Sequence, residues 1–242
     1  MFIQFLKLVR KTLTFWVAPQ TYQHLENIRI HEAGIVLALI TASKSKSIVE
    51  IGGGAGWQKR YFEERGILLK SFDIETSGYS HLQQGDVIIY DGITLPLKDD
   101  SCDLLFSSNT LEHIANLPDV LSDHHRILNN SGLCIHLMPT ASWRIWTSIS
   151  DVIKKFYFDK PHGELSSNIV KETFDFSERR WRERFEESGF FVQKVIKNRL
   201  FYTGNSIFDS RLSIKFRIFL SYVMGSACKI YIVKLRANKY RN

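Results

Sequence analysis

A glycine-rich segment at the end of a short apolar strand constrains this chain more than any other feature. Residues 49–56 read VEIGGGAG, and a helical pattern starts directly after them. Glycines at such a junction permit positive φ angles and let a ligand approach bare backbone. The next apolar strand ends on Asp73, 23 residues after Glu50, where a carboxylate is placed to accept hydrogen bonds from ribose hydroxyls. Together these features predict a site for an adenosine-containing cofactor, whereas the alternative is a tight packing turn beside a surface carboxylate.

Strands alternate with helices through most of the chain, which is typical of a parallel sheet with helices on both faces. We expect helices over 24–42, 57–65, 117–128 and 177–188, and strands over 47–51, 68–73, 87–90, 103–108, 133–138, 190–196 and 229–235. Residues 129–132 read as a turn, and residues 141–175 as an aromatic, irregular region. The fold class is therefore α/β and doubly wound.

The composition excludes several classes of protein. Apolar residues make up 44% of the 242 residues, so the chain has enough apolar surface to fold. The three cysteines are far apart and form no CxxC pair, which argues against a disulfide scaffold and a thiolate zinc site. The longest apolar runs fall well short of the roughly 20 residues that a membrane-spanning helix needs. No secretion signal is evident, so we expect a cytoplasmic protein.

The net charge of +7 is concentrated at the two ends of the chain. Residues 1–25 carry +3 and residues 210–242 carry +8, so the segment between them carries −4. Apolar residues over 2–17 recur at helical spacing and predict an amphipathic helix, and residues 211–224 place Arg211, Lys215 and Arg217 among apolar side chains. An anionic membrane surface or a nucleic acid would suit such ends, although both segments could instead pack on the core.

The glycine segment does not have the G-x-G-x-x-G spacing of a dinucleotide site, which argues against an NAD-dependent oxidoreductase. It resembles the E/D-x-G-x-G-x-G motif of class I S-adenosylmethionine (SAM) methyltransferases. In that family the acidic residue lies near the amino-acid moiety of SAM, and the glycines pass beneath the cofactor. The resemblance implies a Rossmann-like sheet, mostly parallel, with a C-terminal antiparallel strand.

Four further motifs of the family follow in order. Residues 91–96, DGITLP, resemble the segment whose acid flanks the adenine, and residues 99–105, DDSCDLL, resemble the entry to the fourth strand. Residues 108–114, SNTLEHI, resemble the L-E-H motif, and residues 126–132, RILNNSG, resemble R-x-L-K-P-G-G without its Lys and Pro. The resemblance implies SAM as the cofactor and a cofactor site formed by Glu50, Gly52, Gly54, Gly56, Asp73, Asp91, Gly92 and Asn109.

The same resemblance suggests a division of the chain. We expect an N-terminal helical segment over 1–45 and a SAM-dependent methyltransferase domain over 46–242. Residues 140–176 and 198–227 are expected as insertions on the substrate or membrane side of that domain.

Two histidines are candidates for proton removal from an acceptor hydroxyl. His113 follows the fourth strand, at the edge where this type of sheet places ligands, and His162 lies in a polar PHGE segment. Each could instead be a histidine hydrogen-bonded within a loop. His136 is expected in the core, and we expect no metal at His124 and His125, because adjacent residues leave a helix in different directions.

The acceptor is less constrained than the cofactor. Trp143, Arg144 and Trp146 follow the fifth strand, and aromatic and guanidinium groups suit sugars, lipid-like chains and phosphates. With Trp181 and the PHGE segment they are similar to methyltransferases of bacterial surface-polysaccharide synthesis, although a packed aromatic cover over the sheet would also explain them. We expect O-methylation of a sugar or lipid-linked glycan at the cytoplasmic membrane face. The alternatives are an RNA methyltransferase and a non-catalytic membrane- or RNA-binding adaptor, while the SSNT end of the fourth strand argues against base amino-methylation.

Overall fold

A seven-stranded sheet forms the centre of the computed structural model, which describes residue 4 and residues 21–83, 86–155, 160–204 and 212–236. The strand order is β3-β2-β1-β4-β5-β7-β6. The parallel strands are β1 (Ile48–Ile51), β2 (Lys70–Ile74), β3 (Val87–Tyr90), β4 (Cys102–Ser108) and β5 (Leu128–Pro139). The last strand, β7 (Cys228–Leu235), pairs antiparallel with β5 and with β6 (Phe190–Lys197). The expected mostly parallel sheet with an antiparallel C-terminal strand is confirmed.

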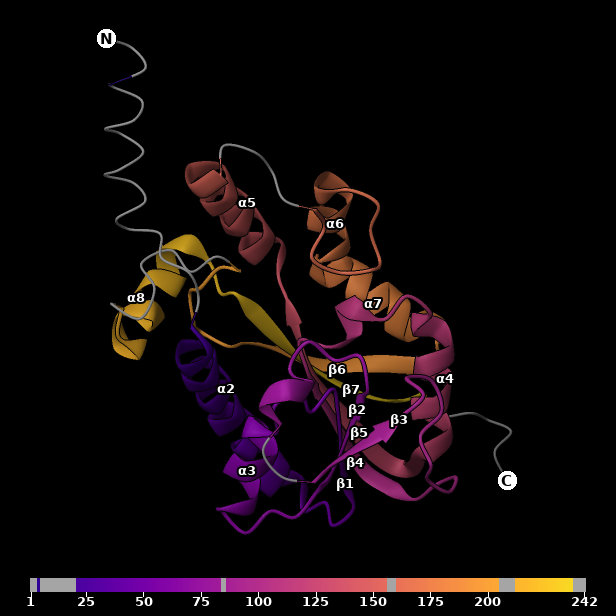
Figure 1. Ribbon diagram of the computed structural model, residues 1–242. Helices are drawn as coiled ribbons and strands as arrows, with labels where there is room; N and C mark the ends of the chain where they lie inside the picture. The colour runs from indigo at the N-terminus through magenta and orange to yellow at the C-terminus, as the bar shows by residue number, and fades with distance from the viewer. Residues whose placement is uncertain (1–3, 5–20, 84–85, 156–159, 205–211, 237–242) are drawn as a thin grey trace.

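Helices cover both faces of the sheet, as the alternating pattern predicts (Figure 1). On one face, α2 (Tyr22–Ser43) and α3 (Trp57–Glu63) contribute Val36, Ile40 and Phe62 to one buried cluster. On the other face, α4 (Leu117–Ile127) and α7 (Glu178–Glu187) contribute Leu121 and Phe185 to a second cluster. The central strands β1 and β4 therefore bury side chains on both faces, which explains why they read as apolar runs.

Local signals in the sequence account for the helix boundaries. Thr21 accepts a hydrogen bond from the amide of His24 at the start of α2, and Ser177 accepts one from Arg180 at the start of α7. Such side-chain caps satisfy amides that have no partner within the helix. Beyond α7, Gly189 has a φ of +84°, a conformation that glycine adopts without strain. The expected N-cap at Ser177 is confirmed.

The region after β5 is more regular than the sequence suggested. Residues 141–175 were expected to be irregular, but the structure places α5 (Ala141–Lys155) and α6 (Ile169–Asp175) there. The aromatic residues hide an apolar stripe at helical spacing, in which Ile145, Ile149 and Val152 recur every three or four positions. Thr140 begins α5 by accepting a hydrogen bond from the amide of Trp143. Farther along the chain, α8 (Ile214–Met224) lies within the apolar, basic stretch near the C-terminus.

The expected turn over 129–132 is also wrong as a boundary, because β5 runs continuously from Leu128 to Pro139. The pairing with β4 jumps from Cys102↔Leu128 to Leu104↔Leu133. Four residues of β5 therefore lie opposite a single residue of β4, so the turn-forming residues make an irregularity within the strand.

Two further expectations concern the N-terminal helix and the cysteines. The amphipathic helix expected over 2–17 lies outside the described residues except at residue 4. The three cysteines are all buried as free thiols, which confirms that they form no disulfide scaffold. Among the described helices, none combines the length and the apolar content needed to cross a membrane.

Candidate functional site

A cavity of about 640 Å³ opens at the carboxyl ends of β1, β2 and β4. The strand order reverses at this point, because β1 pairs with β2 on one side and β4 on the other, and sheets of this kind bind ligands at such a crevice. Two short 3₁₀ turns, η1 (Ser80–Leu82) and η2 (Leu111–His113), follow β2 and β4. The cavity is lined by Gly52, Gly54, Asp73, Asp91, Gly92, Asn109, His113 and His162, so it gathers eight of the ten residues expected at the site.

The glycine loop forms one wall of this cavity, and its geometry requires glycine. Gly52 has a φ of +72°, and a Cβ at this position would overlap the side chain of Thr110. A Cβ on Gly53 would likewise overlap the hydroxyl of Ser71. Gly56 also has a positive φ, of +78°, and is the N-cap of α3, although it is absent from the cavity lining. Gly52 and Gly53 therefore fit between β1 and its neighbours only because they have no side chains.

Most amides of the loop already have partners within the protein. Gly52 and Gly53 both donate to the carbonyl of Phe72, at 2.8 and 3.1 Å, and Gly56 donates to Gly53. The amide of Gly54 donates to Asp73 Oδ2 at 2.7 Å. A pyrophosphate needs several free amides at a loop of this kind, so the hydrogen bonding suits a cofactor that has no phosphate.

Asp73 lies beside the loop at the end of β2 and is 7% exposed. Its Oδ2 accepts the Gly54 amide and its Oδ1 accepts the Ile74 amide at 2.8 Å. Each carboxylate oxygen has two lone pairs, so both retain capacity for a ligand hydroxyl. The backbone thus holds the carboxylate in one orientation toward the cavity.

Glu50 does not reach the cavity surface. Its side chain is 1% exposed and accepts a hydrogen bond from the Ser71 hydroxyl at 2.6 Å, behind the glycine loop. Burial raises the pKa of Glu50 to about 7, and the hydrogen bond from Ser71 opposes this rise. The carboxyl group is therefore placed to hold β1 against β2.

On the next strand, Asp91 lies at the outer rim of the cavity and is solvent-exposed. Its Oδ1 accepts the amides of Ile93 and Thr94 at 2.8 and 2.7 Å, and these hydrogen bonds lower the pKa of Asp91. The adjacent Gly92 has a φ of +84°. The two residues form a tight turn that shapes the rim after β3.

His113 and His162, hereafter the imidazole pair, meet on the wall beyond Asn109. Their ring centroids are 4.6 Å apart, and the edge of Trp143 packs against His162 at 4.7 Å. Both side chains face the cavity. The surrounding protein shields the rings from water in part and lowers the pKa of both, while Glu164 opposes this for His113. Both imidazoles are therefore neutral at pH 7, the form that accepts a proton.

Backbone contacts hold the imidazole pair together although 49 positions separate the two residues in the sequence. The amide of Glu164 donates to the carbonyl of Glu112 at 2.9 Å, and the amide of Gly163 donates to Glu172 Oε1 at 2.7 Å. A Cβ on Gly163 would overlap the carbonyl of Glu112. The close approach of these two segments thus depends on the glycine next to His162.

Comparisons with known proteins agree with this geometry. Residues 49–136 match the model of a family described as "Methyltransferase domain". The chain is similar to the malonyl-[acyl-carrier protein] O-methyltransferase of Salmonella typhimurium, with 22% identity over 178 residues that cover 69% of this chain and 66% of the relative. A second enzyme of the same name, from Marinomonas sp., is 22% identical over 49% of this chain and 47% of the relative. Residues 49–136 therefore form a methyltransferase domain, and the sheet around them has the class I SAM-dependent methyltransferase fold.

Solved structures of methyltransferases share the fold. A chain of the complex between the Haloferax volcanii Trm112 methyltransferase activator and a methyltransferase has a TM-score of 0.57, with 15% identity over 90% of this chain and 94% of that one. A SAM-dependent methyltransferase from Archaeoglobus fulgidus has a TM-score of 0.51, with 16% identity over 84% of this chain and 94% of that one. The matches to the two malonyl-carrier enzymes span about half to two thirds of their length.

The residues present fit SAM, the methyl donor of this family. SAM has no phosphate, and the loop amides at Gly52, Gly53 and Gly54 are already occupied by protein acceptors. The cavity has room for a ligand at the backbone of Gly54, where an added Cβ would meet only Tyr79, at 3.7 Å. Asp73 would hold the ribose hydroxyls, and the glycine loop would lie against the amino-acid moiety.

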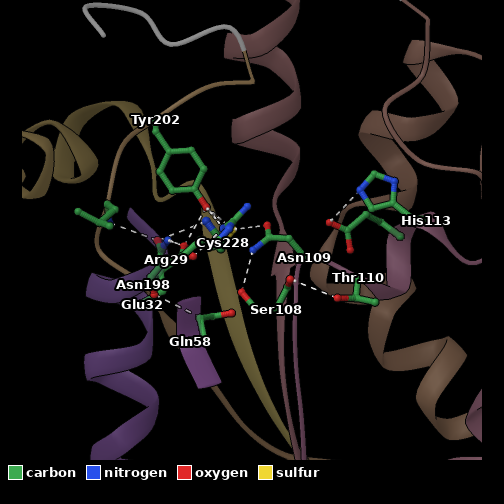
Figure 2. Close-up of polar contacts among 12 residues, drawn as sticks. Arg29, Glu32, Gln58, Ser108, Asn109, Thr110, His113, Asn198, Tyr202 and Cys228 are labelled. Atoms are coloured by element: carbon green, nitrogen blue, oxygen red, sulfur yellow. Dashed lines mark hydrogen bonds and ion pairs between the residues drawn. The ribbon is translucent and has the colours of Figure 1, made fainter. Parts of the chain in front are cut away.

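A polar network that the sequence did not reveal lies beside the cavity, where Arg29 and Asn109 belong to the lining. Figure 2 shows Asn109 between His113 on one side and a group that includes Arg29 and Tyr202 on the other. Arg29 pairs with Glu32 at 2.7 Å, and Glu32 Oε1 accepts from Tyr202 and Asn198. The remaining link is Cys228, whose Sγ donates to Asn109 Oδ1 at 3.2 Å. Asn109 itself has a φ of +53°.

The sequence contains only a weak indication of this network. Arg29 and Glu32 occupy one face of α2 beside fully buried Ile28 and Ala33. A charged residue on the apolar face of a helix indicates a buried partner, but its partners lie 166 and 170 positions away in the sequence. Neither spacing nor composition could identify them.

Other histidines and Arg144 lie away from the cavity. His136 is buried and bonds to Ser107 through Nδ1 at 2.8 Å, as expected for a core histidine, and it stacks on His124. Arg144 was considered as a phosphate ligand, but it is 1% exposed and pairs with Glu172 and Asp151 at 3.3 and 3.8 Å. That interpretation is wrong, because its charge is already used within the protein.

Proposed function

We propose that this protein is an active SAM-dependent methyltransferase that methylates an oxygen atom of a sugar-containing, lipid-linked acceptor at a membrane surface. The observation that carries the proposal is the joint lining of one cavity by Asp73 and the imidazole pair. A cofactor site and a proton-accepting group therefore face the same space. The similarity to two O-methyltransferases favours oxygen as the acceptor atom.

Methyl transfer depends mainly on how the donor and the acceptor are positioned. SAM, when bound, supplies a methyl group already activated by its positive sulfur, so orientation provides much of the acceleration. A sugar hydroxyl must still lose its proton, and the imidazole pair offers two acceptors, of which His113 is the stronger base because burial lowers the pKa of His162 to about 3. Trp143 restrains the His162 ring by its edge contact, which keeps the imidazole pair directed at the cavity.

The lipid-linked part of the proposal is supported by an apolar groove between α5 and α6. Its volume is about 740 Å³, and its lining is almost wholly apolar, with Ile145, Ile149, Val152, Ile153, Ile169 and Val170. The groove adjoins the acceptor side of the cavity, because Trp143 on α5 touches His162 and Glu172 on α6 binds the amide of Gly163. A hydrocarbon chain in the groove would bring its polar end toward the imidazole pair.

Helix α8 adds a second apolar surface. Ile214 and Ile218 pack on a core cluster that includes Ile28 and Trp143, whereas four side chains on the outward side are 47–78% exposed, namely Phe216, Phe219, Tyr222 and Val223. Exposed aromatic residues on one side of a helix are typical of segments that lie at a membrane surface.

One residue of the expected basic surface, Arg217, lies in the protein interior. Arg217 is fully buried and donates to the carbonyls of Phe201 and Leu212, so it contributes no charge to a membrane contact. Lys215 is exposed, and Arg211 lies outside the described residues. The proposed attachment thus depends more on the α8 aromatics than the charge pattern suggested.

The activity is tested by incubating the protein with cell extract and SAM labelled in its methyl group. The extract is then separated into lipid, glycan, protein and RNA. Label in the lipid or lipid-linked glycan fraction supports the proposal, whereas label in RNA would establish the rival RNA methyltransferase. No label in any fraction, together with no SAM binding, would favour the adaptor.

Membrane attachment is tested by sedimentation with anionic and neutral vesicles. The double variant Phe216→Ser, Phe219→Ser should leave most of the protein in the supernatant, while the native chain sediments with anionic vesicles. The matched control is Leu68→Ser, which removes a side chain of 76% exposure elsewhere on the surface. Equal sedimentation of the double variant and the native chain would contradict the role of α8.

A further inference from the structure

Three side chains of metal-binding type converge on the acceptor side of the cavity. Each of Glu112, His113 and His162 offers one ligand atom, and these atoms all lie within 4.8 Å of one another. Two of the three come from the η2 turn and the third from the loop before α6. This is the single such group of three among the residues that the structure describes.

Glu112 is the unusual member of the group. Its side chain is fully buried, and neither carboxylate oxygen accepts a hydrogen bond from another described residue. His113 Nε2 lies 4.0 Å from Glu112 Oε1, which is beyond hydrogen-bonding distance. A buried carboxylate without a partner is unfavourable, so such groups are normally paired with a cation or bound to a metal.

The charges that act on Glu112 are mainly acidic. Glu172 and Glu32 act on it as negative charges, and Arg29 acts as a positive one. The same surroundings hold Arg144, which is paired with Glu172 and Asp151, and Glu164, which acts on His113. The acidic groups therefore outnumber the arginines around the imidazole pair.

The backbone fixes the two halves of the group against each other. Glu164 donates its amide to the carbonyl of Glu112, and Gly163 packs so closely on that carbonyl that no side chain fits. His162 lies directly before this contact. The two segments are thus joined beside the ligand atoms.

We propose that Glu112, His113 and His162 bind one divalent transition-metal ion, for which zinc is the best chemical match. Two imidazoles and one carboxylate are a common set for zinc in catalytic sites, where a fourth position stays open. The ligand atoms need to close by about 1–2 Å to reach bonding distances to one ion. The stacked pair His124 and His136 offers a contrast, because its histidines are fully buried and no carboxylate completes a set with them among the described residues.

The open position would face the cavity, because both imidazoles line it. If the proposed methyl transfer to oxygen is correct, on which this step rests, the ion would bind the acceptor oxygen and lower the pKa of its hydroxyl group. The imidazole pair would then act as ligands, and the proton would leave to solvent. Metal binding itself does not depend on that function.

The direct test is calorimetric titration of the full chain with zinc chloride, after dialysis against a chelator and without SAM or acceptor. We expect one ion per native chain, and at least about a tenfold weaker affinity in His162→Ala and in Glu112→Gln. The matched control is His81→Ala, which removes an exposed imidazole outside the group and should leave the affinity unchanged. Cobalt(II) titration adds a spectroscopic readout, because a four-coordinate cobalt site absorbs visible light.

Two results would overturn the proposal: a native chain that binds no stoichiometric zinc, or His162→Ala and Glu112→Gln variants that bind it as tightly as the native chain does. The melting curve of each variant without zinc checks that it is folded. Since the titration contains no SAM, a failure to bind zinc is distinct from a failure to transfer methyl groups.

Discussion

The two walls of the cavity are built in different ways. The cofactor wall, formed by Gly52, Gly54 and Asp73, comes from one strand–loop–helix unit and the adjoining strand, and backbone hydrogen bonds hold the carboxylate in place. The acceptor wall, formed by Glu112, His113 and His162, joins two segments distant in the sequence through contacts at Gly163. On this wall, Glu112 accepts no hydrogen bond from another described residue, and the side chain of His113 is 42% exposed.

This difference indicates a division of labour. A wall fixed by backbone geometry suits a ligand that is the same in every reaction of the family. A wall held by a few side chains and one glycine contact can change its chemistry with few substitutions. We therefore expect substitutions on one wall to change SAM affinity and substitutions on the other to change turnover.

The largest effect is expected on the acceptor wall. His113→Ala should lower turnover by about 10²–10⁴-fold, the usual contribution of proton removal, whether the imidazole acts as a base or as a ligand. SAM affinity should stay the same, because no cofactor-wall residue touches this ring. Steady-state rates and SAM calorimetry on the same preparation check both parts, with His81→Ala as the control. Full turnover in His113→Ala would leave His162 as the candidate.

A substitution on the cofactor wall should instead reduce SAM affinity, and the effect should be smaller. Asp73→Ala should weaken SAM binding at least about tenfold, because hydrogen bonds to a charged acceptor are worth about 1.5–3 kcal/mol. Asp73→Asn keeps the shape and one acceptor oxygen, and it should lie between the native chain and the alanine variant. Calorimetric titration with SAM gives the three affinities. If they are equal, Asp73 does not contact the cofactor.

The glycine contact provides a third test. Gly163→Ala places a methyl group against the carbonyl of Glu112, so the two segments must separate. Overpacking of this kind costs about 1–3 kcal/mol of folding free energy, and the displaced His162 should also reduce turnover. Gly78→Ala is the stability control, since an added Cβ there meets nothing within 4 Å. Thermal unfolding that is unchanged in Gly163→Ala would show that the contact is not needed.

The smallest effect concerns Glu50, behind the cofactor wall. Because burial raises its pKa to about 7 from the ordinary 4.5, the folded chain binds this proton more tightly than the unfolded chain does. The free energy of unfolding should therefore fall as pH rises from about 4.5 to about 7 and then level off for this group. Glu50→Gln should remove part of that fall, on the order of 1 kcal/mol.

Denaturant unfolding of the native chain and of Glu50→Gln across this pH range measures the difference. Other buried acids, such as Glu112, titrate in both proteins and cancel in the comparison. Parallel curves for the two proteins would show that Glu50 titrates normally.

The parts of the fold that the sequence predicts well are those with strong periodic patterns. The expected strand over 87–90 matches β3, and the strand over 103–108 matches β4 within one residue. Helix α5 was missed because tryptophans and serines obscured its apolar stripe, which separates a helix from a loop only when spacing is counted. The irregularity in β5 over residues 129–132 was not predicted, because turn-forming residues also occur within irregular strands.

The candidate site divides in the same way. Asp73 and the glycines could be placed from spacing along consecutive elements, because parallel strands end at one edge of a sheet. The contact between His113 and His162 could not be predicted, since it depends on how α5 and α6 return the chain to the η2 turn. The network of Arg29, Glu32 and Tyr202 likewise depends on packing between segments more than 160 residues apart.

The central claim is that the two walls act separately. It is tested most directly by measuring SAM affinity and turnover on variants of each wall. SAM affinity and turnover are measured together on the native chain, Asp73→Ala and His113→Ala. We predict that Asp73→Ala loses SAM affinity at least about tenfold, whereas His113→Ala binds SAM as the native chain does and loses turnover by about 10²-fold or more. A native chain that binds no SAM, or a His113→Ala variant that loses SAM affinity as strongly as Asp73→Ala, would contradict the account.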